Sequence, residues 1–370
     1  MQSLFEAYSE IKESYYHIQC DAKDLFTCDA ASSQKNCFGF LDAHYQLGHK
    51  KELFDNDLLN PNKRHGKHIH SVSLYLLGMT LIPTFKKHIS EKMRKFVPHF
   101  TQLYKSDYDF WHIWYLTSMY HDYASCAELG TIQENDSEQH RSLNYHLGNH
   151  NIFYSPYMDF PYKMCDIPFR FSPKLIENYF YYRACRGNCE HGIIAGYLFF
   201  DRFVKNFLSN TEGLFENGQY SIIRYGLNWD IGYLAVAAYV ADAIICHNIW
   251  LGGTTEKNEY TQYGLTPLLY DDHKESKLSL EKYPLQFMLC LLDTIEPIKR
   301  FGGSLSPREI LDKISVCCPS NSSSSLSISW SNTIVQHEKF KNWRHGIIDL
   351  QNWMDVSVAQ GGNYVEINFR

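Results

Sequence analysis

Apolar residues recur with the helical period along most of this chain, from Lys67 to Phe301. A period near 3.6 residues places them on one face of each helix, and such a face is stable when it packs against a neighbour. The pattern predicts helices over residues 66–82, 86–104, 108–124, 173–184, 190–209, 231–250 and 281–299. The central part of the chain is therefore predicted to be a mainly α helical bundle.

The two flanks of this helical region have a different character. Residues 1–60 begin with a short amphipathic pattern over 4–19 and continue as a polar, extended segment. After Gly302-Gly303 the chain combines a capped helix from Ser306, a helix near 337–351 and the alternating runs LSISW, VSVAQ and YVEINF. We expect an N-terminal segment (1–60), a helical domain (61–303) and a small α+β appendage (304–370).

Two long connections interrupt the predicted helices. Residues 126–172 are rich in Asn, His, Pro and Tyr, and residues 251–280 contain GGTTEKNEY and DDHKESK. Connections of this length in a compact domain are usually lids, insertions or binding loops. We expect residues 126–172 to be an insertion in the helical domain.

Composition and charge narrow the class of protein. Hydrophobic residues make up 44% and charged residues 21% of the 370 residues, as in ordinary globular proteins. The net charge of −6 gives no overall basic field for a nucleic-acid backbone. The N-terminus lacks the basic start and apolar core of a secretory signal. The longest apolar stretch is interrupted by Asp242, so it is a poor candidate for a membrane helix. The odd number of cysteines, 11, favours a reducing compartment. We expect a cytoplasmic protein without a membrane span.

The 18 histidines include one at an informative place, Tyr120-His121-Asp122, where a strongly apolar helical pattern ends. Imidazole is a common ligand of transition metals. Adjacent residues point about 100° apart on a helix, but near its end both side chains can reach one ion. By itself a His-Asp pair is weak support for a metal site.

Other predicted helices place a similar side chain among apolar neighbours. His70 shares a helix face with Leu74 and Leu77. His191 opens EHGIIAGYLFFDRF, His247 follows GYLAVAAYVADAIIC, and Asp293 lies in FMLCLLDTIEPIKRF. A carboxylate or imidazole buried in this way needs a partner. One metal centre shared by five helices explains all of these positions together.

These motifs resemble the HD-domain superfamily of metal-dependent phosphohydrolases. The family pattern is His, His-Asp, His, His and Asp on successive helices, and it matches IHS, YHD, EHG, CHN and LLDTIEPIKR here. The match runs from residue 65 to residue 301 and implies an HD-type helical bundle. It implies six metal ligands, namely His70, His121, Asp122, His191, His247 and Asp293.

The resemblance further implies a dinuclear centre in which Asp122 bridges the two ions and acts with His121 in catalysis. His70, His121 and Asp293 would complete the first site, and His191 and His247 the second. His and carboxylate ligands suit Mn²⁺, Fe²⁺, Co²⁺, Ni²⁺ or Zn²⁺ better than Mg²⁺ or Ca²⁺. Two such ions can activate water for attack on a phosphate ester.

Substrate phosphates need cationic partners, and several basic residues lie near the motifs. The candidates are Arg64, Lys67, Arg202, Lys205, Lys299 and Arg300. The chain also departs from particular branches of the family. Tyr123-Ala124-Ser125 replaces the Gly-Lys typical of cyclic di-nucleotide hydrolases, and Asn248 replaces the second His typical of CRISPR-associated nucleases.

The main hypothesis is a phosphohydrolase that cleaves a phosphate mono- or diester in a nucleotide-like small molecule. Two alternatives stay open: a metal-dependent nuclease acting on single-stranded DNA or RNA, and a nucleotide sensor or scaffold that retains the metal site. In the last case residues 304–370 would contact a protein partner. No membrane partner is expected.

Overall fold

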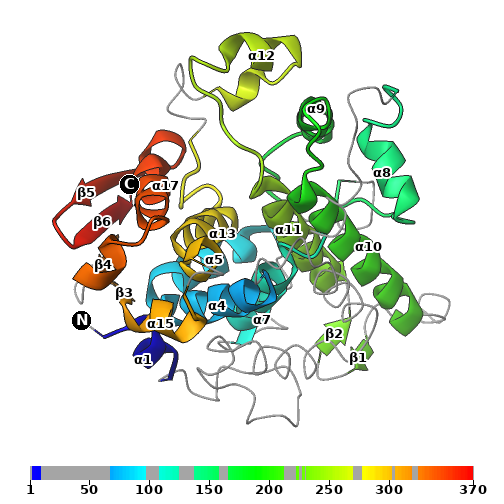
Figure 1. The fold of residues 1–370 in the computed structure, drawn as a ribbon. Helices are drawn as coiled ribbons and strands as arrows, with labels where there is room; N and C mark the ends of the chain where they lie inside the picture. The colour runs from blue at the N-terminus through cyan, green and yellow to red at the C-terminus, as the bar shows by residue number, and fades with distance from the viewer. Residues whose placement is uncertain are drawn as a thin grey trace. The chain divides into compact units, whose positions relative to one another are not determined.

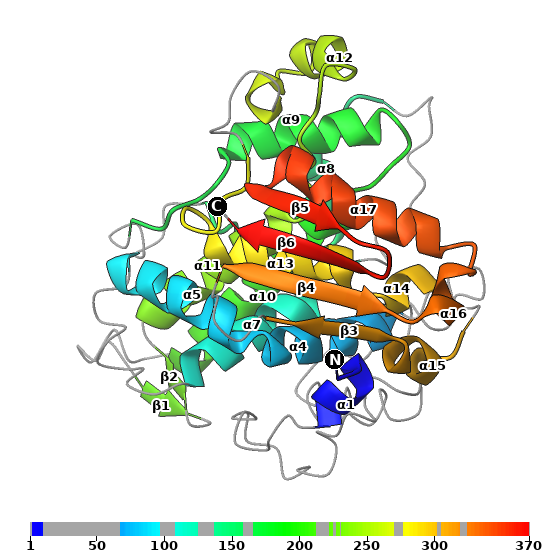
Figure 2. The same cartoon turned by 90° about the vertical axis from the view of Figure 1, so that its left-hand side faces the viewer.

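The computed structural model describes residues 2–9, 67–96, 108–124, 137–157, 166–211, 222–224, 227–229, 231–269, 277–301, 305–318 and 324–369. Within these ranges the fold is mainly helical with a small C-terminal antiparallel sheet of four strands, as predicted (Figures 1 and 2). The chain forms two compact units. Unit 1 comprises Met1–Ile89, Phe110–Met119 and Lys277–Arg370; unit 2 comprises Ser90–Asp109 and Tyr120–Ser276. The division at residues 60 and 303 stays a prediction.

The helices of unit 1 come from both ends of the chain. They are α1 (Leu4–Ser9), α4 (Lys67–Thr80), α5 (Ile82–Phe96, to Ile89 in this unit), α7 (Tyr108–Tyr120, to Met119 in this unit), α13 (Pro284–Ile295) and α14 (Ile298–Phe301). Trp114 of α7 is fully buried and donates its indole N–H to the Tyr75 carbonyl of α4 at 3.0 Å. A Cβ at Gly78 would lie 2.0 Å from that indole nitrogen, so the close approach requires glycine.

The C-terminal sheet of unit 1 has the strand order β3-β4-β6-β5, seen in orange to red in Figure 2. Its elements are α15 (Pro307–Asp312), β3 (Ile314–Cys317), β4 (Ser325–Trp330), α16 (Asn332–Val335), α17 (Phe340–Trp353), β5 (Val356–Gln360) and β6 (Tyr364–Phe369). Ile328 pairs with Val365, and both are fully buried because alternate side chains face the core. Phe369 packs against Phe85 and Phe287. The sheet is thereby fixed to the helices of unit 1.

Unit 2 is built around one helix that is buried all round. Its elements are α8 (Leu143–Asn149), α9 (Pro173–Ala184), α10 (His191–Thr211), β1 (Ile222–Arg224), β2 (Leu227–Trp229), α11 (Ile231–Cys246), α12 (Lys257–Gln262) and the 3-10 helix η7 (Thr266–Leu268). Every residue from 233 to 247 is buried, as expected for a helix that is apolar on all faces. A Cβ at Gly196 of α10 would lie 2.7 Å from the Ala241 carbonyl, so α10 and α11 pack backbone to backbone (Figure 1).

The predicted helices are present, with shifts at their ends. The pattern over 190–209 is α10, and the pattern over 281–299 is α13 followed by α14. The pattern over 86–104 is described only to Phe96, and the N-terminal pattern only to Ser9. No pattern in the sequence predicted β3, a strand of four residues. In the part of the chain that is described, no helix is long and apolar enough to cross a bilayer.

Candidate metal centre

Four of the six predicted ligands lie together within unit 2, and we call His121, Asp122, His191 and His247 the unit 2 cluster. His121 and Asp122 form the turn directly after α7. His191 is the first residue of α10, and His247 directly follows α11. The cluster therefore collects side chains from three helix ends, where the chain turns and neighbouring side chains can point the same way.

The distances in the unit 2 cluster suit a metal ion. Asp122 Oδ1 lies 2.9 Å from His191 Nε2, and Asp122 Oδ2 lies 3.7 Å from His121 Nε2. One ligand atom each of His121, Asp122 and His247 lies within 4.8 Å of the others. All three residues are buried, with exposures of 0%, 3% and 6%. Nitrogen and carboxylate donors at this spacing could hold a divalent transition metal.

Neighbouring groups fix the orientation of the imidazoles in this cluster. His247 Nδ1 lies 2.5 Å from the Ile244 carbonyl, so Nδ1 carries the proton and Nε2 is left as the ligand atom. The Asn248 amide nitrogen lies 2.9 Å from His191 Nε2. A Cβ at Gly192 would lie 2.7 Å from His247 Cε1, so glycine there leaves room for the ring. Gly192 and Asn248, which are adjacent in sequence to His191 and His247, therefore help to position the imidazole rings of the unit 2 cluster.

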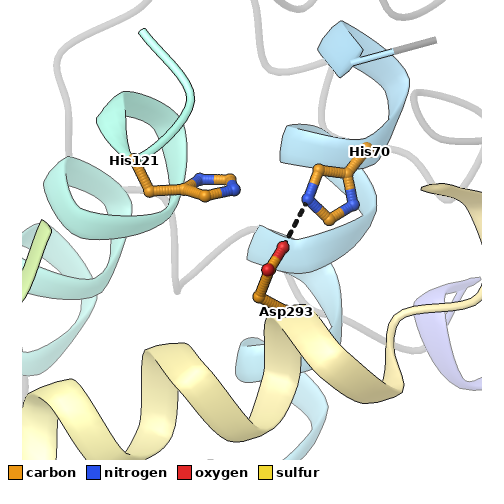
Figure 3. Close-up of side chains that lie close together, drawn as sticks. All are labelled: His70, His121 and Asp293. Carbon is orange, nitrogen blue, oxygen red and sulfur yellow. Dashed lines mark ion pairs between the residues drawn. The ribbon is translucent and has the colours of Figure 1, made fainter. Parts of the chain in front are cut away.

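The remaining two predicted ligands lie in unit 1, where we define the unit 1 cluster as His70, Asp293, Glu296 and Lys299. His70 of α4 is fully buried, and its Nε2 lies 2.8 Å from Asp293 Oδ1 of α13 (Figure 3, dashed line). Glu296 follows α13 as its C-cap, and its Oε2 lies 2.6 Å from His70 Nδ1. Lys299 Nζ lies 3.0 Å from Asp293 Oδ1. Both ring nitrogens of His70 thus face carboxylates.

The surroundings of His70 raise its pKa. Burial and the charge of Lys299 lower the pKa, but hydrogen bonds to Asp293 and Glu296 and the charge of Glu296 raise it more. A cation on the ring is favoured by two carboxylates. A divalent ion between His70 Nε2 and Asp293 would compete for the same position.

The candidate phosphate-binding residues have varied surroundings. Arg64 and the side chain of Lys67 lie outside the described residues. Lys205 pairs with Asp201 at 2.6 Å and donates to the Asn151 carbonyl at 3.0 Å. A helical rise of about 1.5 Å per residue places Lys205 about 21 Å along α10 from His191. The position of Lys205 on α10 therefore does not support a role in binding a phosphate next to the unit 2 cluster.

The other three candidate cations, Arg202, Arg300 and Lys299, differ in exposure and in distance from the predicted ligands. A rise of about 1.5 Å per residue puts Arg202 of α10 about 16 Å from His191 along the helix. Arg300 is exposed. Lys299 Nζ lies 3.0 Å from Asp293 Oδ1 and so contacts a predicted ligand. All of these assignments stay predictions.

Sequence reasoning missed Glu296 and Asn248. Glu296 lies three residues after Asp293, and its burial at 0% exposure is unusual for a charged side chain. The signal was an acidic residue at the end of an apolar helix, directly before Pro297. Asn248 was noted only as a departure from one branch of the family, and it contacts His191.

Two further buried carboxylates in unit 2 hold parts of the predicted insertion. Asp201 accepts the backbone N–H groups of Phe153 and Tyr154 at 2.8 and 3.1 Å. Asp242 accepts the Tyr157 hydroxyl at 2.8 Å. Burial raises the pKa of Asp242 to about 6, although hydrogen bonds from Tyr157, the Arg170 backbone and Cys246 lower it. The insertion is therefore tied to α10 and α11 through buried carboxylates.

Comparisons of the chain with protein-family models, with curated proteins and with solved structures find no match. The likeness to HD-domain phosphohydrolases accordingly rests on the ordered motifs and on the buried clusters alone. What the structure supports directly is a buried His/Asp cluster in unit 2 that could hold metal.

Proposed function

We propose that the protein is an HD-type metal-dependent phosphohydrolase that cleaves a phosphate mono- or diester in a nucleotide-like substrate. The observation that carries the proposal is the buried triad of His121, Asp122 and His247, whose ligand atoms lie within 4.8 Å of one another. His191, at 2.9 Å from Asp122, adds a fourth side chain. Divalent ions, when bound, lower the pKa of a coordinated water and neutralise charge that develops on a phosphoryl group.

In this proposal each residue of the unit 2 cluster has a distinct role. Asp122 is the single carboxylate of the cluster, and both of its oxygens face imidazoles, so it is suited to bridge two ions. His247 offers Nε2, because its Nδ1 is held by the Ile244 carbonyl. His121 and His191 supply the further nitrogen ligands. Burial of His121, Asp122 and His247 excludes water from these ligands and fixes their orientation.

The proposal also assigns roles to the unit 1 cluster. His70 and Asp293 would serve as ligands of the first ion, as the order of the family motifs implies. Lys299 brings a positive charge to Asp293 and so suits a substrate phosphate beside the ion. The ions would be Mn²⁺, Fe²⁺, Co²⁺, Ni²⁺ or Zn²⁺, since the ligands are imidazoles and carboxylates.

Elemental analysis together with a substrate panel tests the proposal. Wild-type protein and Asp122→Ala would be compared on p-nitrophenyl phosphate, bis-p-nitrophenyl phosphate, nucleoside mono- and triphosphates and single-stranded DNA. We expect bound transition metal and phosphoester hydrolysis in the wild type. Loss of Asp122 should lower the rate by about 10³-fold, because several kcal/mol of charge stabilisation go with the metal.

The matched control is His345→Ala, which removes an exposed histidine of α17. It should retain metal and activity. A wild type that holds no metal and is no more active than Asp122→Ala would overturn the proposal. Hydrolysis of single-stranded DNA alone would favour a nuclease, and bound metal without hydrolysis of any panel member would favour a sensor or scaffold.

A further inference from the structure

Glu296 receives four hydrogen bonds and is completely buried. Oε1 accepts from the Ser73 hydroxyl at 2.6 Å and from the Ile298 backbone N–H at 3.0 Å. Oε2 lies 2.6 Å from His70 Nδ1 and accepts the Lys299 backbone N–H at 3.0 Å. Each oxygen therefore has two donors. A carboxylate with this many donors has a single well-defined position.

This arrangement decides which nitrogen of His70 is available as a ligand. Glu296 acts as an acceptor, so His70 Nδ1 must carry a proton to bond with it. The opposite nitrogen, Nε2, then faces Asp293 Oδ1 at 2.8 Å. Carboxylate partners of this kind fix the tautomer and the ring orientation of metal-binding histidines.

The hydrogen bonds continue from Glu296 to the N-terminal helix α1. Ser73 uses its hydroxyl proton on Glu296, and the Tyr8 hydroxyl of α1 donates to the Ser73 carbonyl at 3.1 Å and lies 3.2 Å from the Ser73 Oγ. Tyr8 is 1% exposed. Burial raises the pKa of Tyr8 far above its usual range, so its hydroxyl keeps its proton. The Ser73 hydroxyl thus donates to Glu296, and the Tyr8 hydroxyl holds Ser73 by donating to its backbone carbonyl.

We propose that Glu296 is the positioning residue that holds His70 as a metal ligand, and that Ser73 and Tyr8 hold Glu296 in turn. The inference rests on the proposed function, because it takes His70 to be a ligand. It brings α1, which lies outside the residues that resemble the HD family, into the support of the candidate metal centre. Tyr8, Ser73 and Glu296 act through His70 and do not touch the ion.

Metal titration of matched variants tests this proposal. Wild type, His70→Ala, Glu296→Gln, Ser73→Ala and Tyr8→Phe would be titrated with Mn²⁺ by isothermal titration calorimetry. Glu296→Gln should weaken Mn²⁺ binding by about 10–100-fold, the range typical of outer-shell partners. Glutamine has one acceptor oxygen, so its NH₂ group would face two of the four donors. Tyr8→Phe should weaken binding by less than about 10-fold, because it acts two contacts away.

A second readout follows the His70 ring itself. In protein labelled with ¹⁵N-histidine, the wild type should show a His70 Nδ1–H, and Glu296→Gln should show a changed ring-nitrogen signal. Glu338→Gln and Tyr364→Phe, which alter exposed side chains of unit 1, should change neither readout. If Glu296→Gln does not fold, Ser73→Ala and Tyr8→Phe carry the same test.

The outcomes separate this inference from the proposed function. Wild-type protein that binds no Mn²⁺ and no other transition metal would overturn both. If the wild type binds metal and His70→Ala weakens binding, while Glu296→Gln, Ser73→Ala and Tyr8→Phe all match the wild type, the positioning role is wrong and the metal site stands. Unchanged ring-nitrogen signals in Glu296→Gln would likewise overturn the positioning role.

Discussion

The unit 1 and unit 2 clusters differ in how their charges are balanced. In unit 1 two carboxylates, Asp293 and Glu296, face the His70 imidazole, and the Lys299 ammonium group balances the charge of Asp293. In unit 2 three imidazoles surround the single carboxylate of Asp122. A cluster with several nitrogen donors around one carboxylate is well suited to take up a metal ion.

The two clusters also differ in how many ligands they offer by themselves. Glu296 engages the ring nitrogen of His70 that faces away from Asp293, so these two carboxylates cannot share one ion at His70. Unit 1 thus brings a ligand pair, whereas unit 2 brings a triad and His191. Among the described residues, the unit 2 cluster therefore offers enough ligands to hold an ion by itself.

The largest expected effect follows from removing a ligand of unit 2. Structural Zn²⁺ sites with four ligands contribute about 10–16 kcal/mol, which is about 2.5–4 kcal/mol per ligand. His247→Ala should therefore weaken metal binding by about 10²–10³-fold. His70→Ala should leave one ion bound in unit 2. Elemental analysis and Mn²⁺ titration of both variants measure the stoichiometry and the affinity.

The opposite result would break the comparison between the clusters. If His70→Ala releases all metal while His247→Ala retains it, unit 1 and not unit 2 holds the tighter ion. His345→Ala, at an exposed position, is the control for the loss of a histidine as such. It should keep the wild-type stoichiometry.

Two buried carboxylates that are not predicted ligands, Glu296 of unit 1 and Asp242 of unit 2, differ in the number of hydrogen bonds that they accept. Glu296 has four donors at 2.6 to 3.0 Å, while Asp242 has the Tyr157 hydroxyl at 2.8 Å and weaker partners at 3.4 and 3.6 Å. Burial raises the pKa of Asp242 from 3.8 to about 6. The folded state therefore favours the protonated carboxyl group of Asp242. The stability that this gives to the folded protein is complete below pH 3.8 and is lost as the pH rises to about 6.

Asp242→Asn should remove this pH dependence. A pKa difference of about 2 units corresponds to about 3 kcal/mol at 1.36 kcal/mol per unit. We expect the free energy of unfolding of the wild type to fall, relative to the variant, by up to that amount between pH 4 and pH 6. Urea unfolding over this range measures the difference. An unchanged pH profile would contradict the prediction, and Asp312→Asn, an exposed substitution, should behave like the wild type.

A smaller effect than that of His247→Ala comes from a residue that is not a ligand, Gly192. A Cβ at Gly192 would lie 2.7 Å from His247 Cε1 and 3.0 Å from the Asn248 Cβ. Gly192→Ala should displace the His247 ring and weaken metal binding by about 10-fold, as outer-shell changes do. Calorimetric titration with Mn²⁺ measures it.

Gly148→Ala is the matched control for this substitution. It also replaces a helical glycine of unit 2, but a Cβ there meets nothing within 4 Å. Metal binding should stay at the wild-type level. Equal affinity for Gly192→Ala and wild type would show that the ring of His247 has room to move.

The helices were predictable because their signal is local. The apolar period identified α9 at residues 173–184 from sequence, and the Ser306 capping box marked the start of α15. The strand β3 was missed because it spans only residues 314–317 and is defined by pairing with β4, which the sequence does not display. The two-unit division was not foreseen either, since unit 1 joins segments from both ends of the chain.

The sequence by itself determined which side chains are candidate ligands, because their order along apolar helices is a property of the chain. Tertiary structure decided the partners. Three hydrogen-bonded pairs lie far apart in the sequence: His70 and Glu296 are 226 residues apart, Tyr8 and Ser73 are 65 apart, and Tyr157 and Asp242 are 85 apart. No local pattern encodes such pairs. They exist because burial forces each polar group to find a donor or acceptor wherever packing brings one.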